Sequence, residues 1–346
     1  MIRCSPRCWG LALIGVLLAS ATLEAQVRSL PPIDLEPVAQ QAMQPLDQNE
    51  MLWFGQDEPP LLIQPGQPPP QPGQSYLDGG APPLGTQWGA APRDRWHWQW
   101  LPDGLMYPNY LASGRESRLG TVLAYERDHG WLWDSALGAH VGILRFGDSH
   151  SALPYGWQID LEGAAFPRLD LQSERELISV DFRAGVPLTI RQGPFEAKVA
   201  YYHISSHLGD DYLFDHPGEL PVNYVRDAVV GAVGLRLVDR LRVYAEAGYA
   251  FCRKGGSKPW EFQFGVDYSR VEPDAPLGSP FFAVNGQIRE EVDFGGNLTA
   301  QAGWQWRGDG GHLLRVGFHY FNGKTDAYQF YTEHEEAYGL GLWYDF

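Results

Sequence analysis

The sequence has no long apolar run after its first 25 residues, and a membrane-spanning helix needs roughly 18–20 such residues in a row. Basic residues are also few, because 26 Lys and Arg stand against 42 Asp and Glu, which gives a net charge of −16. No Lys/Arg cluster of the kind that binds nucleic acid is visible, and the sequence contains no Walker loop, dinucleotide fingerprint or Gly-x-Ser-x-Gly elbow. These absences exclude a polytopic helical membrane protein and argue against nucleic-acid binding.

Aromatic residues, in contrast, are abundant. The 346 residues include 13 Trp, 17 Tyr and 16 Phe, yet the mean hydropathy is only −0.30. The fold must therefore accommodate many large apolar side chains that are dispersed among polar residues along the chain.

Three regions are expected along the chain. Residues 1–21 have basic residues, a short apolar stretch and an Ala-Ser-Ala end, the pattern of a secretory signal peptide. Residues 22–93 form a Pro/Gln-rich segment that predicts a disordered, partly polyproline-II tether, since 14 of the 27 prolines lie within residues 26–93. Such a tether could reach a periplasmic or cell-wall partner. Residues 94–346 contain most of the aromatic residues and form the folded domain.

Hydrophobicity in residues 94–346 alternates with a period of two. The segments that begin near Ile178, Trp260 and Asn297 each present one apolar face and one polar face that carries charges or glycines. Because successive strand side chains point to opposite faces, this pattern predicts strands with one apolar side and one wet side. A packed soluble barrel would instead fill its interior with aliphatic side chains.

About twelve such segments occur, and we therefore predict an all-β fold, an antiparallel transmembrane β-barrel of about twelve strands. Their approximate centres are Leu123, Gly138, Leu161, Phe182, Val199, Ala232, Ala245, Phe264, Asn285, Ala300, Val316 and Leu340. Connections alternate between short and long, as in barrels with short periplasmic turns and long outer loops, except at residues 128–130 and 270–279. A secreted β-sandwich is the alternative fold.

The last strand ends the chain on an aromatic residue. Tyr344 and Phe346 complete an alternating apolar series that begins at Tyr338. This resembles the terminal strand of bacterial outer-membrane proteins, which the barrel-assembly machinery reads. With the signal peptide, it predicts export to the outer membrane of a Gram-negative-type bacterium and contact with outer-membrane lipid.

Residues 193–212 carry a family resemblance. The stretch Tyr201-Tyr202-His203-Ile204-Ser205-Ser206-His207, with residues 181–189 and Tyr110-Leu111-Ala112, resembles the uncharacterised bacterial family called domain of unknown function 1207. The resemblance covers roughly residues 95–346. It implies an outer-membrane β-barrel-like protein and assigns no activity.

Polar residues interrupt the lipid face of the strand near residue 200. His203 and Ser205 continue the face that carries Val199, so the imidazole could take the hydroxyl proton. This His-x-Ser pattern resembles outer-membrane phospholipase A and the lipid A deacylase, although Ser206 stands where those families have Asn. Asp227 interrupts the lipid face of the next strand at a similar height. His203, Ser205 and Asp227 form a candidate catalytic triad of a lipid acyl hydrolase, and a polar barrel rim is the alternative.

Other sites follow from charge alone. Asp210 and Asp211 in a long outer loop could hold calcium, with solvated loop acids as the alternative, and no other cofactor is expected. Arginines at inward positions, opposite acids such as Glu162 and Asp267, could line a selective pore or fill the lumen with salt bridges. Three functions therefore remain open: an outer-membrane barrel that acts in envelope interactions, a narrow pore, and a lipid hydrolase.

Overall fold

The computed structural model describes residues 96–150 and 152–346. The expected signal peptide and tether lie outside these residues. The strands are β1 (His97–Trp100), β2 (Leu119–Glu126), β3 (Gly130–Gly147), β4 (Gly156–Asp170), β5 (Glu176–Gln192), β6 (Phe195–Leu208), β7 (Val225–Val238), β8 (Leu241–Lys254), β9 (Trp260–Tyr268), β10 (Ser279–Arg289), β11 (Gly295–Arg307), β12 (Leu313–Lys324) and β13 (His334–Asp345). The helices are short: α3 (Asp210–Asp215), η2 (Glu290–Val292) and η3 (Tyr328–Phe330). Within the described residues, no helix is long and apolar enough to cross a membrane.

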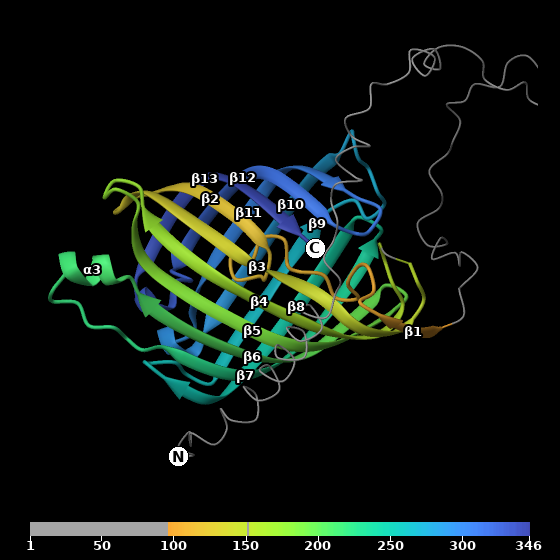
Figure 1. The fold of residues 1–346 in the computed structure, drawn as a ribbon, viewed down its shortest axis with the longest axis horizontal. Helices are drawn as coiled ribbons and strands as arrows, with labels where there is room; N and C mark the ends of the chain where they lie inside the picture. The colour runs from red at the N-terminus through yellow and green to blue at the C-terminus, as the bar shows by residue number, and fades with distance from the viewer. Residues whose placement is uncertain (1–95, 151) are drawn as a thin grey trace, which may run out of the picture. The chain divides into compact units, whose positions relative to one another are not determined.

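Strands β2–β13 form a closed antiparallel barrel (Figure 1). Each strand pairs with its neighbours in the sequence, and β13 closes the barrel against β2, with Tyr344 opposite Leu119. All twelve predicted strand centres lie within these strands. The sequence did not predict β1, which pairs with residues 144–147 of β3, beyond the residues 130–137 that pair with β2.

The period-two pattern separates an apolar exterior from a polar lumen. Along β5, Asp181, Thr189 and Arg191 point inward and are buried, whereas Phe182 and Leu188 point outward and are exposed. The same alternation holds in β9 and β11. Exposed Leu, Val, Phe and Trp side chains occur on the outer face of most strands, so the exterior is of the kind that faces lipid.

The two ends of the barrel differ in loop length. The end that carries β1 and the C-terminus, here called the turn end, has mostly short connections such as residues 193–194 and 239–240. The opposite end, here called the loop end, carries α3 in the connection of residues 209–224 (Figure 1). The two irregular connections expected from the sequence are real exceptions: β2 and β3 join tightly at the loop end, and residues 269–278 form a long connection at the turn end.

Residues 101–118 run through the lumen between β1 and β2, and we call them the plug (Figure 1). Several of its side chains are almost completely buried, including Met106, Tyr107, Tyr110 and Ala112. This segment was not predicted from the sequence, because it has no periodicity and its partners are distant in the chain. The expectation of a wet interior is accordingly corrected, since the plug and paired charges fill much of the lumen.

Arginines of the barrel wall hold the backbone of the plug. Their guanidinium groups donate hydrogen bonds to successive plug carbonyl oxygens: Arg145 to Asp103 and Gly104 (both 2.8 Å), Arg191 to Met106 (2.7 Å), Arg242 to Asn109 (3.4 Å), Arg315 to Leu111 (3.2 Å) and Arg183 to Arg115 (2.7 Å). A buried backbone carbonyl outside a strand or helix needs such a donor, because leaving it unpaired is costly. The plug is therefore fixed by side chains rather than by strand pairing.

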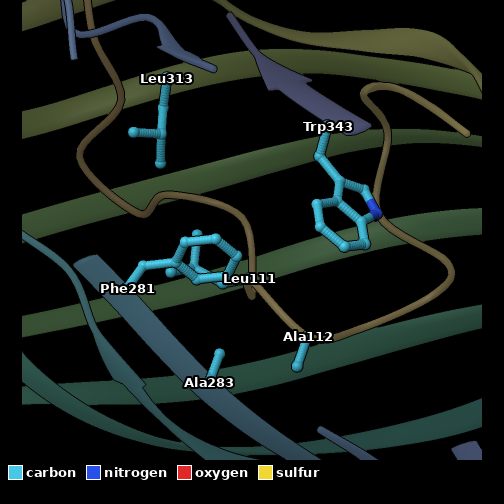
Figure 2. Packing of buried hydrophobic residues seen from close by; sticks show 6 residues of the cluster. All are labelled: Leu111, Ala112, Phe281, Ala283, Leu313 and Trp343. Carbon is cyan, nitrogen blue, oxygen red and sulfur yellow. The ribbon is translucent and has the colours of Figure 1, made fainter. Parts of the chain in front are cut away.

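Apolar and aromatic contacts also hold the plug against the barrel wall. Leu111 and Ala112 pack against a patch of wall residues, shown in Figure 2: Phe281, Ala283, Leu313 and Trp343. Tyr110 stacks on Tyr244 with ring centres 3.9 Å apart and donates a hydrogen bond to Glu246 (2.8 Å). The plug thus has an apolar contact on one part of its length and polar contacts on the rest.

Ion pairs occupy much of the remaining lumen. Arg183 pairs with Glu162 (2.8 Å) and Arg242 with Asp267 (3.3 Å), as the alternation of inward charges indicated. Asp181 pairs with Arg115 of the plug instead (3.0 Å). Small cavities remain on either side of the plug, about 70 Å³ toward the loop end and about 60 Å³ toward the turn end.

Replacing residues 105–114 with a Gly/Ser linker of equal length should open the lumen. The wall arginines would lose the carbonyl groups they hold, and water would enter the space. Single-channel conductance in planar bilayers should rise about tenfold or more over the wild type. Replacing residues 210–219, an equally long segment outside the lumen, should leave conductance unchanged. Equal conductance of the wild type and the plug variant would refute the role of the plug as the seal.

Candidate active site on the outer face of β6 and β7

The outer face of β6 changes from apolar to polar along the strand. Phe195 and Val199 are exposed near the turn end, and they are followed on the same face by Tyr201, His203 and Ser205. Residues of even number, such as Ser206, point into the lumen and are buried. The candidate residues therefore lie on the outside of the barrel, toward the loop end.

Strand pairing brings Asp227 to His203. The two residues are direct register partners on β6 and β7, and His203 Nδ1 lies 2.8 Å from Asp227 Oδ1. The side chains are 25% and 13% exposed, so the pair is partly shielded from solvent. A carboxylate on Nδ1 fixes the imidazole ring and leaves Nε2 as the nitrogen that would take a proton from a hydroxyl.

Ser205 follows His203 by two residues on the same face. Its register partners are Phe182 on β5 and Val225 on β7. At a rise of about 3.3 Å per residue, the two Cα atoms are separated by about 6.6 Å along the strand, which side chains of this length can bridge. The structure thus places the imidazole, the carboxylate and the hydroxyl on one outward surface.

Tyr201 is a fourth member of the group, and it was not among the candidate residues named from the sequence. Its hydroxyl donates a hydrogen bond to Asp227 Oδ1 at 2.7 Å. The available signal was its position two residues before His203 on the same strand face. The phenol and the imidazole therefore contact the same carboxylate oxygen.

Apolar rings border the site. The Phe182 ring lies 6.0 Å from the His207 ring, and the Phe251 ring lies 6.3 Å from the Tyr201 ring. Phe182 and Phe251 are exposed on the outer surface. An apolar substrate could approach the polar group across this surface without leaving an apolar environment.

The remaining candidate residues lie elsewhere. Asp210 and Asp211 form the first turn of α3 and are exposed at the loop end. Across the described residues, no group of three or more His, Cys, Asp or Glu side chains has the arrangement that holds a metal ion, so calcium binding stays a prediction from sequence. Tyr344 and Phe346 lie at the turn end, where their rings are 5.0 Å apart.

The fold and this outward polar group define a class: a closed twelve-stranded β-barrel with a plugged lumen and a potential site on its exterior. The chain belongs to the family described as "Protein of unknown function (DUF1207)", whose model matches residues 98–346. A search of curated proteins returns no match.

Solved structures with some similarity include two outer membrane phospholipases and one porin. The outer membrane phospholipase A from Escherichia coli has 11% identity and a TM-score of 0.44 over 69% of this chain and 91% of that chain. The calcium-bound phospholipase dimer from Salmonella typhi has 11% identity and a TM-score of 0.45 over the same shares. The KdgM porin in complex with disordered oligogalacturonate has 10% identity and a TM-score of 0.38, over 66% of this chain and 99% of that chain. Similarities at this level carry no inference about activity.

The orientation of the two adjacent serines can be tested by cysteine labelling. A cysteine that replaces Ser205 should react with a membrane-soluble maleimide, because this side chain points outward. A cysteine that replaces Ser206 should stay protected inside the lumen. Labelling is measured by mass spectrometry against the wild type, which corrects for native cysteines. Equal labelling at both positions would show that the outward assignment is wrong.

Proposed function

We propose that this protein is an outer-membrane β-barrel that hydrolyses acyl esters of membrane lipid at its outer rim. The observation that carries the proposal is the contact between His203 Nδ1 and Asp227 Oδ1, on the outward face and beside Ser205. The apolar exterior of a closed barrel supports the membrane location, because it has no favourable contact with water. The signal-peptide pattern of residues 1–21 supports export to the outer membrane.

Each residue has one role in the proposed reaction. Ser205 Oγ attacks the ester carbonyl carbon while His203 Nε2 accepts the hydroxyl proton. The tetrahedral intermediate collapses, the ester C–O bond breaks, and His203 returns the proton to the departing alcohol. Water then attacks the acyl-serine with His203 again as the base, which releases the fatty acid and regenerates Ser205. Asp227 orients the imidazole and stabilises its charged form.

Tyr201 acts as a positioning residue in this scheme. Its hydrogen bond to Asp227 holds the carboxylate in the orientation that His203 needs. Tyr201 contacts Asp227 and not the Ser205 hydroxyl. Removing the Tyr201 hydroxyl would therefore alter the orientation of the base, His203, and leave the nucleophile, Ser205, in place.

The filled lumen makes the pore a weaker proposal. A narrow pore would require the plug to leave the wall arginines and the apolar patch around Leu111. Interaction with a periplasmic or cell-wall partner would depend on residues 22–93, which lie outside the described residues. Neither alternative rests on an observed arrangement comparable to that of His203 and Asp227.

Ser205→Ala should abolish ester hydrolysis, because no nucleophile would remain. Turnover of a phospholipid in mixed detergent micelles should fall about 10³-fold or more, and Asp227→Asn should lower it by about 10²–10⁴-fold. Tyr201→Phe should have a smaller effect, about tenfold or less. Fatty-acid release measures all three.

Ser206→Ala is the matched control for this series, since it removes a neighbouring hydroxyl that faces the lumen. It should retain the activity of the wild type. No turnover by the wild type, or equal turnover by Ser205→Ala and the wild type, would exclude the hydrolase.

We also propose that the barrel-assembly machinery recognises the terminal strand through Tyr344 and Phe346. Phe346→Ala should reduce the amount of protein in the outer-membrane fraction several-fold, because the last aromatic ring of the recognised strand is lost. Heat-modifiable migration of the extracted protein measures folding. Phe214→Ala, which removes a highly exposed ring in α3, should assemble normally. Normal assembly of the Phe346 variant would rule out this role.

A further inference from the structure

A second polar site lies at the turn end of the lumen, at the opposite end of the barrel from Ser205. The cavity of about 60 Å³ there is bordered by the plug and by wall residues that include Arg236, Arg242, Asp267 and Arg307. A cavity needs only about 10–15 Å³ of water-accessible volume to hold one water molecule, so this cavity is large enough for a small polyatomic ion. Arg240 and Gly311, from two turns, border its mouth.

Arg236 is a buried residue at this cavity. Its side chain is only 9% exposed, and among the described residues its buried Nε has no hydrogen-bond partner. Its nearest carboxylate oxygen, on Glu196, is 3.9 Å from Nε. An arginine cannot lose its charge to escape burial, so buried guanidinium donors that lack hydrogen-bond partners are costly unless a ligand satisfies them.

The carboxylate nearest to Arg236 is already shared. Glu196 pairs with Arg191 at 2.6 Å and with Arg242 at short range, so its oxygens are committed to those two groups. Arg242 also pairs with Asp267, yet its second terminal nitrogen has no hydrogen-bond partner among the residues that the structure describes. Two guanidinium groups in one cavity therefore have unused donors.

Positive charge is in excess around this cavity. Four arginines border it, Arg236, Arg240, Arg242 and Arg307, against the side-chain carboxylates of Asp267 and Asp345. The terminal carboxylate of Phe346, another residue at the cavity, adds one negative charge and leaves the excess positive. The surplus is notable in a protein whose net charge is −16.

We infer that this cavity binds a tetrahedral oxyanion, either free phosphate or the phosphate of a monoester, that enters from the turn end. The guanidinium of Arg236 presents paired donors whose spacing matches two oxygens of a phosphate. The unused nitrogen of Arg242 and the exposed Arg240 at the mouth supply further positive charge. Neutral ligands would leave the charge excess uncompensated, and a long chain would not fit beside the plug.

The inference is tested by calorimetric titration of the full-length protein in detergent. Inorganic phosphate and glycerol 3-phosphate are the two probes, at constant ionic strength set with chloride. Binding of either probe supports the site and identifies which source it accepts. Arg236→Gln should weaken that binding about tenfold or more. The affinity of Arg236→Lys should lie between that of this variant and the wild type, because an ammonium keeps the charge but lacks the paired N–H donors of a guanidinium.

Arg253→Gln is the matched control, because Arg253 is exposed near the loop end of β8. It should bind both probes like the wild type. If circular dichroism shows that Arg236→Gln does not fold, Arg240→Gln at the exposed mouth replaces it and should weaken binding several-fold. Absence of binding for both probes, or equal binding by the arginine variants and Arg253→Gln, would overturn the inference. Ester hydrolysis is measured separately, so failure of one site does not decide the other.

Discussion

The hydrogen bonds from wall arginines to the carbonyl groups of the plug are the interaction on which the interior depends. In the barrel wall, the backbone N–H and C=O groups of each strand bond to the neighbouring strands. A non-periodic segment in the lumen must therefore be held mainly by side chains of the wall. The inward positions of β3, β5, β8 and β12 supply guanidinium groups for this purpose. Each of these arginines combines a positive charge with several donors in a fixed geometry. The same residue type therefore closes the lumen, seats the plug and sets the electrostatics of the cavities beside it.

The barrel separates two kinds of chemistry by the direction in which side chains point. On β6, Ser205 and Ser206 are adjacent in the chain, yet one faces the exterior and the other faces the lumen. On the exterior, the polar group around His203 is bordered by apolar side chains, and this arrangement suits an amphiphilic ester. At the turn end of the lumen, a small cavity carries excess positive charge, and this arrangement suits a compact anion. Because the wall lies between them, the two sites have no route by which one ligand could occupy both.

Much of the fold was predictable because strand periodicity is a local property. The alternation along residues 178–191 identified both faces of β5. The alternation along β6 identified His203 and Ser205 as outward before any partner was known. Asp227 was predictable as a neighbour of His203, since both interrupt apolar faces at similar heights on adjacent strands. Tyr201 was missed, because an aromatic residue on a lipid face already has an ordinary explanation there. Its role depends on the orientation of one hydroxyl group.

The sequence by itself determined the number of barrel strands, the face on which their side chains lie and the general alternation of short and long connections. These features repeat every second residue or follow from segment lengths, so they need no knowledge of distant contacts. Only the tertiary structure decided where residues 101–118 go, which carboxylate each inward arginine pairs with, and that Arg236 keeps only a 3.9 Å contact with Glu196. These outcomes depend on closure of the barrel, which brings β3, β7 and β12 around one lumen. Contacts between residues so far apart in the chain leave no periodic trace in it.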